Sequence, residues 1–329
     1  MCSEGPPGGK QLYTPDRREA KNIPAEVINM TRRTFTQTVA GVALSATALK
    51  PFRLGAGPLP LERDEMAGVP LKISIMLWTV FGNLPFEQRL EKVAEAGYHN
   101  VQLGGECAKW SEDDFRNVNR RRRELGISFD CMGGIPHGLV DPREREAFLS
   151  DLRGMLPIIE RIECPAIIFV SGNVVPAMSR QAQHESIVEG LKRAAEIADA
   201  KGVTLLLETI DLPENPKIYL WSMAECFKII GEVGHPRVKA LYDFYHEQIS
   251  EGNLISKLVK NIDKVGGVHI ADVPGRHEPG TGEINYPNIY RKLAKLNFQG
   301  TMAMEFIPSG DAVQSLRKAR EEALKAART

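Results

Sequence analysis

From residue 71 onward, the chain alternates short apolar runs with longer stretches in which apolar positions recur at helical spacing. Short apolar runs bounded by turn residues are typical of buried strands, and apolar positions three and four apart are typical of amphipathic helices. The pattern predicts strands at Ile73–Trp78, Asn100–Leu103, Ile127–Met132, Ala166–Val170, Val203–Glu208, Val238–Tyr242, Gly267–Ile270 and Thr301–Phe306. It predicts helices at Phe86–Ala96, Glu112–Leu125, Arg143–Ile162, Arg180–Ala200, Met223–Val233, Asn253–Ile262, Pro287–Leu296 and Ala312–Ala327.

Strands this apolar along their whole length belong to parallel sheets that helices cover. An open, doubly wound α/β sheet is one arrangement of such units. Eight regular units favour closure instead, so we predict a (β/α)₈ TIM barrel over residues 71–329.

The first 70 residues lack this alternation and divide into three predicted segments. Residues 1–29 are polar and rich in Gly and Pro, which indicates a disordered extension or a mis-assigned start before Met30. Residues 30–48 contain Arg32-Arg33 and then a weakly apolar run with an A-x-A site, which resembles a twin-arginine signal peptide. The apolar run is too short to span a membrane. Residues 49–70 are predicted to be a linker because several Pro and Gly residues interrupt them.

The signal peptide predicts a periplasmic or secreted protein, and a cytoplasmic one if the signal is not used. The chain has 42 basic and 42 acidic residues, so their charges cancel and the sequence predicts no general attraction to nucleic acid. The five cysteines form no C-x-x-C pair, so we expect them to be buried and unpaired. The sequence is compatible with a homo-oligomer.

Polar residues end the last four predicted strands, where barrel enzymes carry their working groups. They are Glu208, Asp243, His269 and Glu305, separated by 35, 26 and 36 residues, or about one repeat each. Three carboxylates around a common point would repel one another unless a cation lay among them. The set therefore predicts a divalent metal site, for Mn²⁺ or Mg²⁺ first, with Co²⁺, Fe²⁺ and Zn²⁺ as alternatives.

Further polar residues lie in the segments that follow these strands. Glu214 is six residues after Glu208, His246 is three after Asp243, and Arg276 lies in a long Pro- and Gly-rich loop after His269. We expect that loop to close over a small substrate. Trp78 and His137, at the ends of the first and third predicted strands, are weaker candidates for the same pocket.

These segments resemble the xylose isomerase-like barrel superfamily, and within it the hydroxypyruvate isomerases. The segment from His269 to Tyr286 carries the resemblance most specifically, and Asp243-Phe244-Tyr245-His246 adds to it. The resemblance implies that Glu208, Asp243, His269 and Glu305 bind a metal and that Glu208 and Glu305 form the acid–base pair. Ketose epimerases of the superfamily contact substrate at the positions of Glu214, His246 and Arg276. Hydroxypyruvate isomerases often carry Gln at the position of His269, so His269 is more like the epimerases.

The predicted activity is therefore metal-dependent isomerisation or epimerisation of a small keto sugar or hydroxy-keto acid through an enediolate. The partner is a small-molecule carbohydrate or keto acid. An exported lyase that cleaves 3-keto glycosides by enolisation and β-elimination is the main alternative. A zinc phosphodiesterase acting on abasic DNA would need more His ligands than the strand ends offer, and a purely sugar-binding barrel would not need four metal ligands in register.

Overall fold

A computed structural model describes Val69 and residues 71–329. Its strands are β1 (Lys72–Met76), β2 (Asn100–Leu103), β3 (Ser128–Met132), β4 (Ala166–Val170), β5 (Thr204–Glu208), β6 (Val238–Asp243), β7 (Val265–Ile270) and β8 (Thr301–Met304). Its α-helices are α1 (Phe86–Glu95), α2 (Glu112–Glu124), α3 (Arg145–Ile162), α4 (Arg180–Asp199), α5 (Met223–Val233), α6 (Phe244–Ser250), α7 (Leu254–Lys260), α8 (Tyr286–Lys295) and α9 (Ala312–Ala327). Short 3₁₀ turns are η1 (Leu77–Thr79), η2 (Glu106–Lys109) and η3 (Ile262–Lys264).

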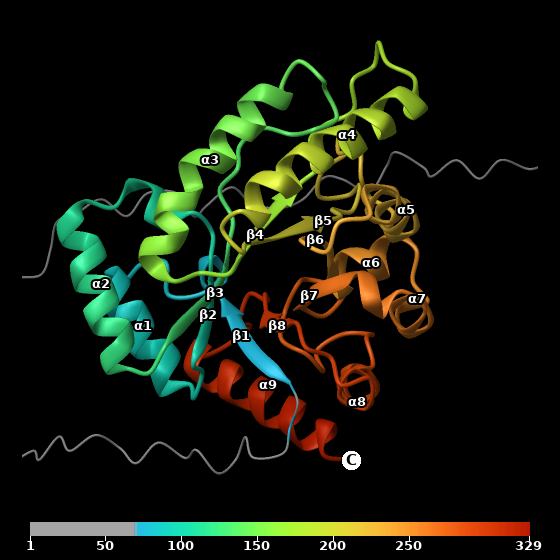
Figure 1. Cartoon of the computed structure of the whole chain (residues 1–329). Coiled ribbons are helices and arrows are strands. Elements are labelled where there is room, and N and C mark those ends of the chain that lie inside the picture. Colours follow the sequence, from blue (N-terminus) through green and yellow to red (C-terminus); the bar gives the residue numbers. More distant parts are fainter. Residues whose placement is uncertain (1–68, 70) are drawn as a thin grey trace, which may run out of the picture. The chain divides into compact units, whose positions relative to one another are not determined.

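The strands form one closed parallel barrel in chain order, with β8 hydrogen-bonded to β1. Figure 1 shows the strands at the centre and the helices around them. The predicted (β/α)₈ barrel is confirmed. Because every strand runs in the same direction, the loops that follow the strands all meet at one end of the barrel.

Alternation along the strands separates two apolar clusters. The larger cluster lies between strands and helices and contains most of the buried apolar side chains. The smaller cluster consists of Met76, Cys131, Ala166, Ile168, Leu206 and Leu241. This smaller cluster lies on the opposite strand face, in the barrel interior. Its members Ile168, Leu206 and Leu241 each lie two positions before the last residue of a strand, and these last residues are Val170, Glu208 and Asp243. Side chains two positions apart share a face of a strand, so the side chains at these strand ends also point to the barrel interior.

Two predictions near the site are wrong. Strand β1 ends at Met76, and Trp78 lies in η1 rather than at the strand end. The helix predicted at Asn253–Ile262 corresponds to α7, and the sequence did not predict α6, so His246 lies on a helix rather than in a loop. The side chain of Asp243 accepts hydrogen bonds from the backbone N–H groups of Tyr245 and His246, so it caps α6 directly after β6.

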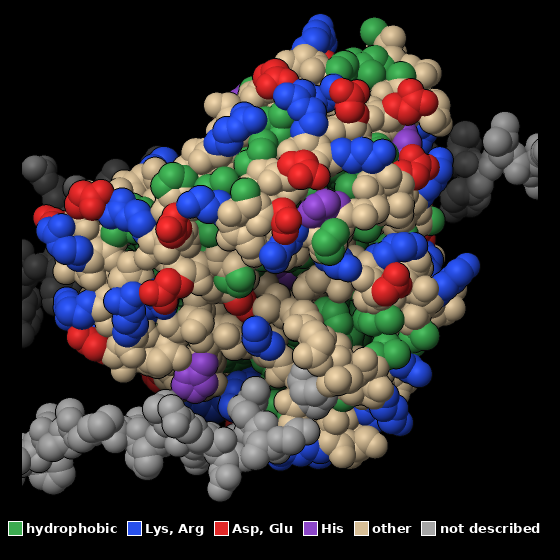
Figure 2. All heavy atoms as spheres, viewed as in Figure 1, with side chains coloured by type: hydrophobic (Ala, Val, Ile, Leu, Met, Phe, Trp, Pro, Cys, Tyr) green, Lys and Arg blue, Asp and Glu red, His purple; other side chains and the backbone are tan. Residues whose placement is uncertain are grey.

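The predicted extension (1–29), signal peptide (30–48) and linker (49–70) lie outside the described residues, apart from Val69. Within residues 71–329, none of the helices has the length and apolar composition that crossing a membrane requires. The four described cysteines, Cys107, Cys131, Cys164 and Cys226, are buried and free, as predicted. Figure 2 shows acidic and basic side chains interspersed over the visible face, in line with the balanced net charge.

Candidate metal centre

The four predicted ligands come together at the carboxyl end of the barrel. Glu208 and Asp243 are the last residues of β5 and β6, His269 is on β7, and Glu305 directly follows β8. Asp243 pairs with His269 in the strand register, and the Glu305 N–H donates to the Ile270 carbonyl at 2.9 Å. One donor atom from each of the four lies within 4.8 Å of the others, and all four residues are buried. Neighbouring parallel strands thus achieve the convergence that the spacing predicted.

The donor atoms of this group, which we call the ligand cluster, surround a common point. His269 Nδ1 lies 2.6 Å from Glu305 Oε2, 3.5 Å from Glu208 Oε1 and 3.9 Å from Asp243 Oδ2. Within the described residues, neither His269 Nδ1 nor Asp243 Oδ2 has a hydrogen-bond partner of acceptable geometry. Buried polar atoms are rarely left unpaired. Unpaired lone pairs aimed at one point, with three carboxylates and one imidazole, fit a divalent cation.

Gln102 on β2 orients the imidazole of His269. Its Oε1 lies 2.8 Å from His269 Nε2, and its own Nε2 donates to Thr301 Oγ1 at 3.2 Å. Because the oxygen of Gln102 can only accept, Nε2 of the imidazole carries a proton and Nδ1 is the nitrogen that faces the cluster. Nδ1 could then give its lone pair to a cation, and such an outer partner is typical of metal-binding histidines. The sequence analysis did not select Gln102, which is a mid-strand residue.

The charges within the cluster affect the two glutamates differently. Burial raises the pKa of Glu208, and the nearby imidazole of His269, whose own pKa the glutamates raise so that it is charged in the metal-free protein, opposes this only in part. Burial would also raise the pKa of Glu305, but the charges of His269 and Arg276 and the Trp78 hydrogen bond outweigh it and lower this pKa below its usual range. In the metal-free cluster, Glu305 is thus the more firmly ionised of the two carboxyl groups.

Arg276 and Trp78 cover the Glu305 side of the cluster. The Arg276 Nη2 donates to Glu305 Oε2 at 3.0 Å, and its Nη1 donates to both oxygens of Glu214 at 3.0 and 3.1 Å. The indole Nε1–H of Trp78 donates to Glu305 Oε1 at 2.8 Å, while 47% of Trp78 remains exposed. The guanidinium lies 5.5 Å from the Trp78 ring centroid and 5.0 Å from that of Tyr245. Trp78 therefore lies at the mouth of the site.

A second group of donor atoms lies beside the first. It consists of Asp211, Glu214 and His246, and within it Asp211 and His246 are buried and Glu214 is exposed. The His246 Nδ1 lies 2.6 Å from Asp211 Oδ2, and its Nε2 lies 3.6 Å from Asp243 Oδ2. Burial opposes protonation of His246, but the charge of Asp243 and the bond to Asp211 raise its pKa to about 9. The sequence analysis missed Asp211, although it lies only three residues after Glu208.

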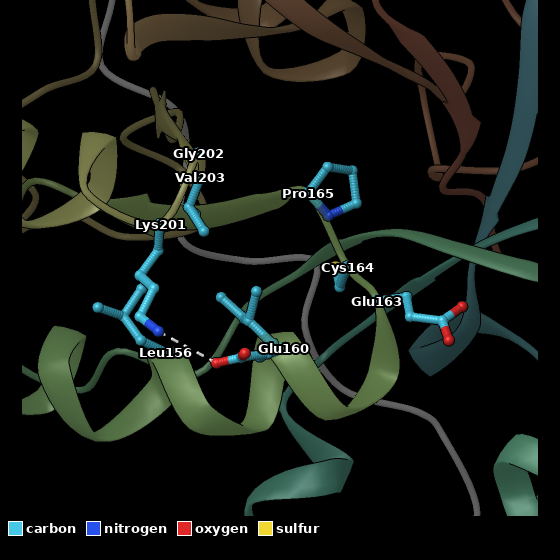
Figure 3. A pocket seen from close by; sticks show the side chains of 9 residues that line it. Leu156, Glu160, Glu163, Cys164, Pro165, Lys201, Gly202 and Val203 are labelled. Atoms are coloured by element: carbon cyan, nitrogen blue, oxygen red, sulfur yellow. Dashed lines mark hydrogen bonds and ion pairs between the residues drawn. The ribbon is translucent and has the colours of Figure 1, made fainter.

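The three predicted substrate residues, Glu214, His246 and Arg276, therefore all border the ligand cluster. His137 instead pairs with Asp151, with Nδ1 and Oδ2 2.6 Å apart. Figure 3 shows a different hollow, of about 340 Å³, at the end of the barrel where β4 and β5 begin. There Lys201 and Glu160 point toward each other across 3.2 Å, and none of the predicted site residues lines it.

Comparisons with known proteins identify the family of the chain. The model of the family described as xylose isomerase-like TIM barrel matches residues 90–327. The chain belongs to this family. A putative hydroxypyruvate isomerase of Danio rerio is 30% identical to it, over 77% of this chain and 95% of that protein. A 2-oxo-tetronate isomerase of Pectobacterium atrosepticum is 27% identical, over 74% of this chain and 95% of that protein. Both relatives are named as isomerases, in agreement with the isomerase class predicted from the sequence.

A solved structure described as an AP endonuclease of family 2 from Brucella melitensis has the same fold, with a TM-score of 0.68. The two chains are 25% identical, and the match covers 75% of this chain and 96% of that chain. The family model confirms the predicted membership in the xylose isomerase-like superfamily, and the relatives include proteins named as hydroxypyruvate isomerases, in line with the predicted resemblance.

Proposed function

We propose that the chain is a divalent-metal-dependent isomerase or epimerase of a small hydroxy-keto compound, acting through an enediolate. One observation carries the proposal: four buried donors from four neighbouring strands converge, and His269 Nδ1 and Asp243 Oδ2 have no hydrogen-bond partner among the described residues. The names of the relatives support a hydroxy-keto acid or keto sugar as the substrate class.

The ligand cluster would hold the cation through Glu208, Asp243, His269 and Glu305. A cation bound there supplies Lewis acidity, which polarises the substrate carbonyl and stabilises the enediolate oxygen. Mn²⁺ or Mg²⁺ suits this oxygen-rich set best, with Co²⁺, Fe²⁺ and Zn²⁺ as alternatives. Gln102 keeps the Nδ1 lone pair of His269 directed at the site.

Glu208 and Glu305 are the proposed acid–base pair. One of them removes the proton from the carbon next to the carbonyl, and return of a proton to the neighbouring carbon gives isomerisation. Return to the same carbon from the opposite face, by the other glutamate, gives epimerisation. Burial of both carboxyl groups, at 8% and 5% exposure, limits competing proton exchange with water.

The proposed substrate contacts come from Glu214, His246 and Arg276. Arg276 lies over the cluster with its cationic group against Glu305, so it can hold negative charge that develops on the substrate oxygens. Glu214 and His246 would bind hydroxyl groups on the adjacent side.

The test is deuterium incorporation at the carbon next to the carbonyl, with hydroxypyruvate and D-fructose as substrates in heavy water. Chelated protein should be inactive, and added Mn²⁺ should restore exchange. Glu305→Gln should lower exchange at least a hundredfold while the circular dichroism spectrum stays unchanged. Glu185→Gln, on the exposed face of α4, is the matched control. Exchange that persists without metal, or near-normal turnover of Glu305→Gln, would refute the assignment.

A second candidate is a lyase that acts on 3-keto glycosides, in which the same proton removal precedes β-elimination of the leaving sugar. A polar cavity lined by Val170, the register partner of Glu208, favours it because a glycoside extends beyond the cluster. The product formed from a 3-keto disaccharide separates the two candidates. Release of a free sugar indicates the lyase, and a rearranged but intact disaccharide indicates the isomerase.

We further propose export through the twin-arginine pathway, since Arg32-Arg33 and the apolar run that follows have the composition of such a signal. Replacement of both arginines by lysine should retain the protein in the cytoplasm, as seen by fractionation. Unchanged export would refute this proposal without affecting the enzymatic one.

A further inference from the structure

A cavity of about 450 Å³ lies among the loops that follow β3, β4 and β5, at the same end of the barrel as the ligand cluster. We call it the β4 cavity. Val170, the last residue of β4, lines it and pairs in the strand register with Glu208. Asn215, on another wall, directly follows Glu214, which binds Arg276. Two lining residues are therefore neighbours of site residues, Val170 in the strand register and Asn215 along the chain.

The fold keeps this cavity in shape through a close backbone contact. The N–H of Leu139 donates to the Ser171 carbonyl at 2.8 Å, which joins the loops after β3 and β4. A Cβ atom on Gly138 would lie 2.5 Å from the Cα of Gly172, and Gly172 has a φ of +95°. Only glycine fits this crossing, so the wall is set by backbone rather than by adjustable side chains.

The polar lining consists of amides and carboxylates. Asn215 Nδ2 donates to Asn173 Oδ1 at 3.3 Å, Glu144 accepts the N–H of Gly138 at 3.3 Å, and Asp141 accepts from Arg143. Among its lining residues, all of which are described, there is no Lys, Arg or His. A phosphate or carboxylate would find two carboxylates, of which Arg143 pairs with one, and no cationic lining residue, whereas hydroxyl groups can donate to carboxylates and pair with amides.

We propose that the β4 cavity binds an uncharged sugar ring attached to the reacting keto group, so that the substrate is a keto glycoside rather than a three- or four-carbon keto acid. This inference rests on the proposed function, since the ring is held beside Glu208. The cavity volume lies within the range of about 300–1,000 Å³ usual for small-molecule sites. Its polar lining also matches a ring that carries hydroxyl groups on its edge.

The test fills the cavity without touching the ligand cluster. Val174 lines the cavity and is 42% exposed, so Val174→Trp places an indole in the space. Val259→Trp is the matched control, because Val259 lies on α7, is 38% exposed and does not line the cavity. Deuterium exchange is followed with a one-ring ketose, D-fructose, and with a 3-keto disaccharide of glucose.

Val174→Trp should lower kcat/KM at least tenfold for the disaccharide and less than twofold for D-fructose, while Val259→Trp changes neither. Equal effects of Val174→Trp on both substrates, or no effect on either, would overturn the proposal.

A binding measurement separates this outcome from failure of the proposed chemistry. Saturation-transfer NMR of the metal-free protein with cellobiose, an unreactive neutral probe, should give a signal that Val174→Trp removes and Val259→Trp keeps. Gluconate is the charged probe, and its signal should be absent or the same in the wild type and in Val174→Trp. If no wild-type exchange occurs with any substrate, the proposed chemistry fails while the cellobiose result still decides the cavity. Absence of a cellobiose signal in the wild type overturns the proposal.

Discussion

Asp211 holds His246 by a short contact between two fully buried side chains, with Oδ2 and Nδ1 2.6 Å apart. The other carboxylate oxygen of Asp211 accepts the backbone N–H of Glu214 at 2.9 Å. One buried carboxylate therefore fixes the ring of His246 and the position of Glu214. The charge of this carboxylate also favours the protonated imidazole.

Replacement of Asp211 by Asn should lower kcat for α-proton exchange by roughly ten- to a hundredfold, a loss of about 1.4–3 kcal/mol. The amide can still accept the Glu214 N–H bond, but the charge that favours protonated His246 is lost. The bond to Asp211 raises the pKa of His246, so this pKa should fall in the variant, and the alkaline limb of the kcat–pH profile should move to lower pH. Asp113→Asn, at an exposed ion pair on α2, is the control. A profile unchanged by Asp211→Asn would contradict this role.

Replacement of Arg276 by Lys should lower kcat/KM by a similar ten- to a hundredfold. The planar guanidinium donates to Glu214 and Glu305 through different nitrogens, and a single ammonium group cannot bridge both in that geometry. Initial rates over a range of substrate concentrations measure the effect. Arg237→Lys, which changes an ion pair with Asp199 elsewhere, should leave the rate intact. Equal rates for wild type and Arg276→Lys would show that the bridge does not contribute.

The barrel and the ligand cluster could be predicted because both depend on local patterns. Apolar runs and helical spacing repeat eight times, and Glu208, Asp243, His269 and Glu305 stand where strands end. Because neighbouring parallel strands end at one edge, equivalent positions in the repeat become neighbours in space.

Partners far apart in the chain could not be predicted in the same way. Gln102 looks like an ordinary polar residue of a strand, and its contact with His269 spans 167 positions. Helix α6 is a different case, because its signal is local: Asp243, interpreted from the sequence as a metal ligand, also caps the start of the helix. The same side chain faces the cluster. Trp78 was placed at a strand end, whereas the turn η1 directs its indole N–H to Glu305.

Asp130 should make stability depend on pH. Its Oδ1 accepts from Ser74 at 3.1 Å, and its Oδ2 has no hydrogen-bond partner in the described part of the chain. Burial raises its pKa from 3.8 to about 7, so the folded state favours the neutral carboxyl group. The stability that this group contributes is complete below pH 3.8 and is lost as the pH rises through about 7.

Asp130→Asn, which stays neutral, should therefore gain stability over the wild type as pH rises from about 4 to 7, with the difference levelling off above that. The full difference is on the order of 4 kcal/mol for a shift of this size. Urea unfolding of the chelated proteins at a series of pH values measures it. A difference that does not change with pH would show that Asp130 is ionised in the folded state.

We expect one divalent cation to bind among Glu208, Asp243, His269 and Glu305. Anomalous diffraction at the manganese edge, from crystals grown with Mn²⁺, locates such an ion. It should give one strong peak at about 2.0–2.4 Å from His269 Nδ1 and from an oxygen of each carboxylate, since hard divalent cations take such ligands at these lengths. A peak among Asp211, Glu214 and His246 instead, or no peak at the four-residue cluster, would contradict it.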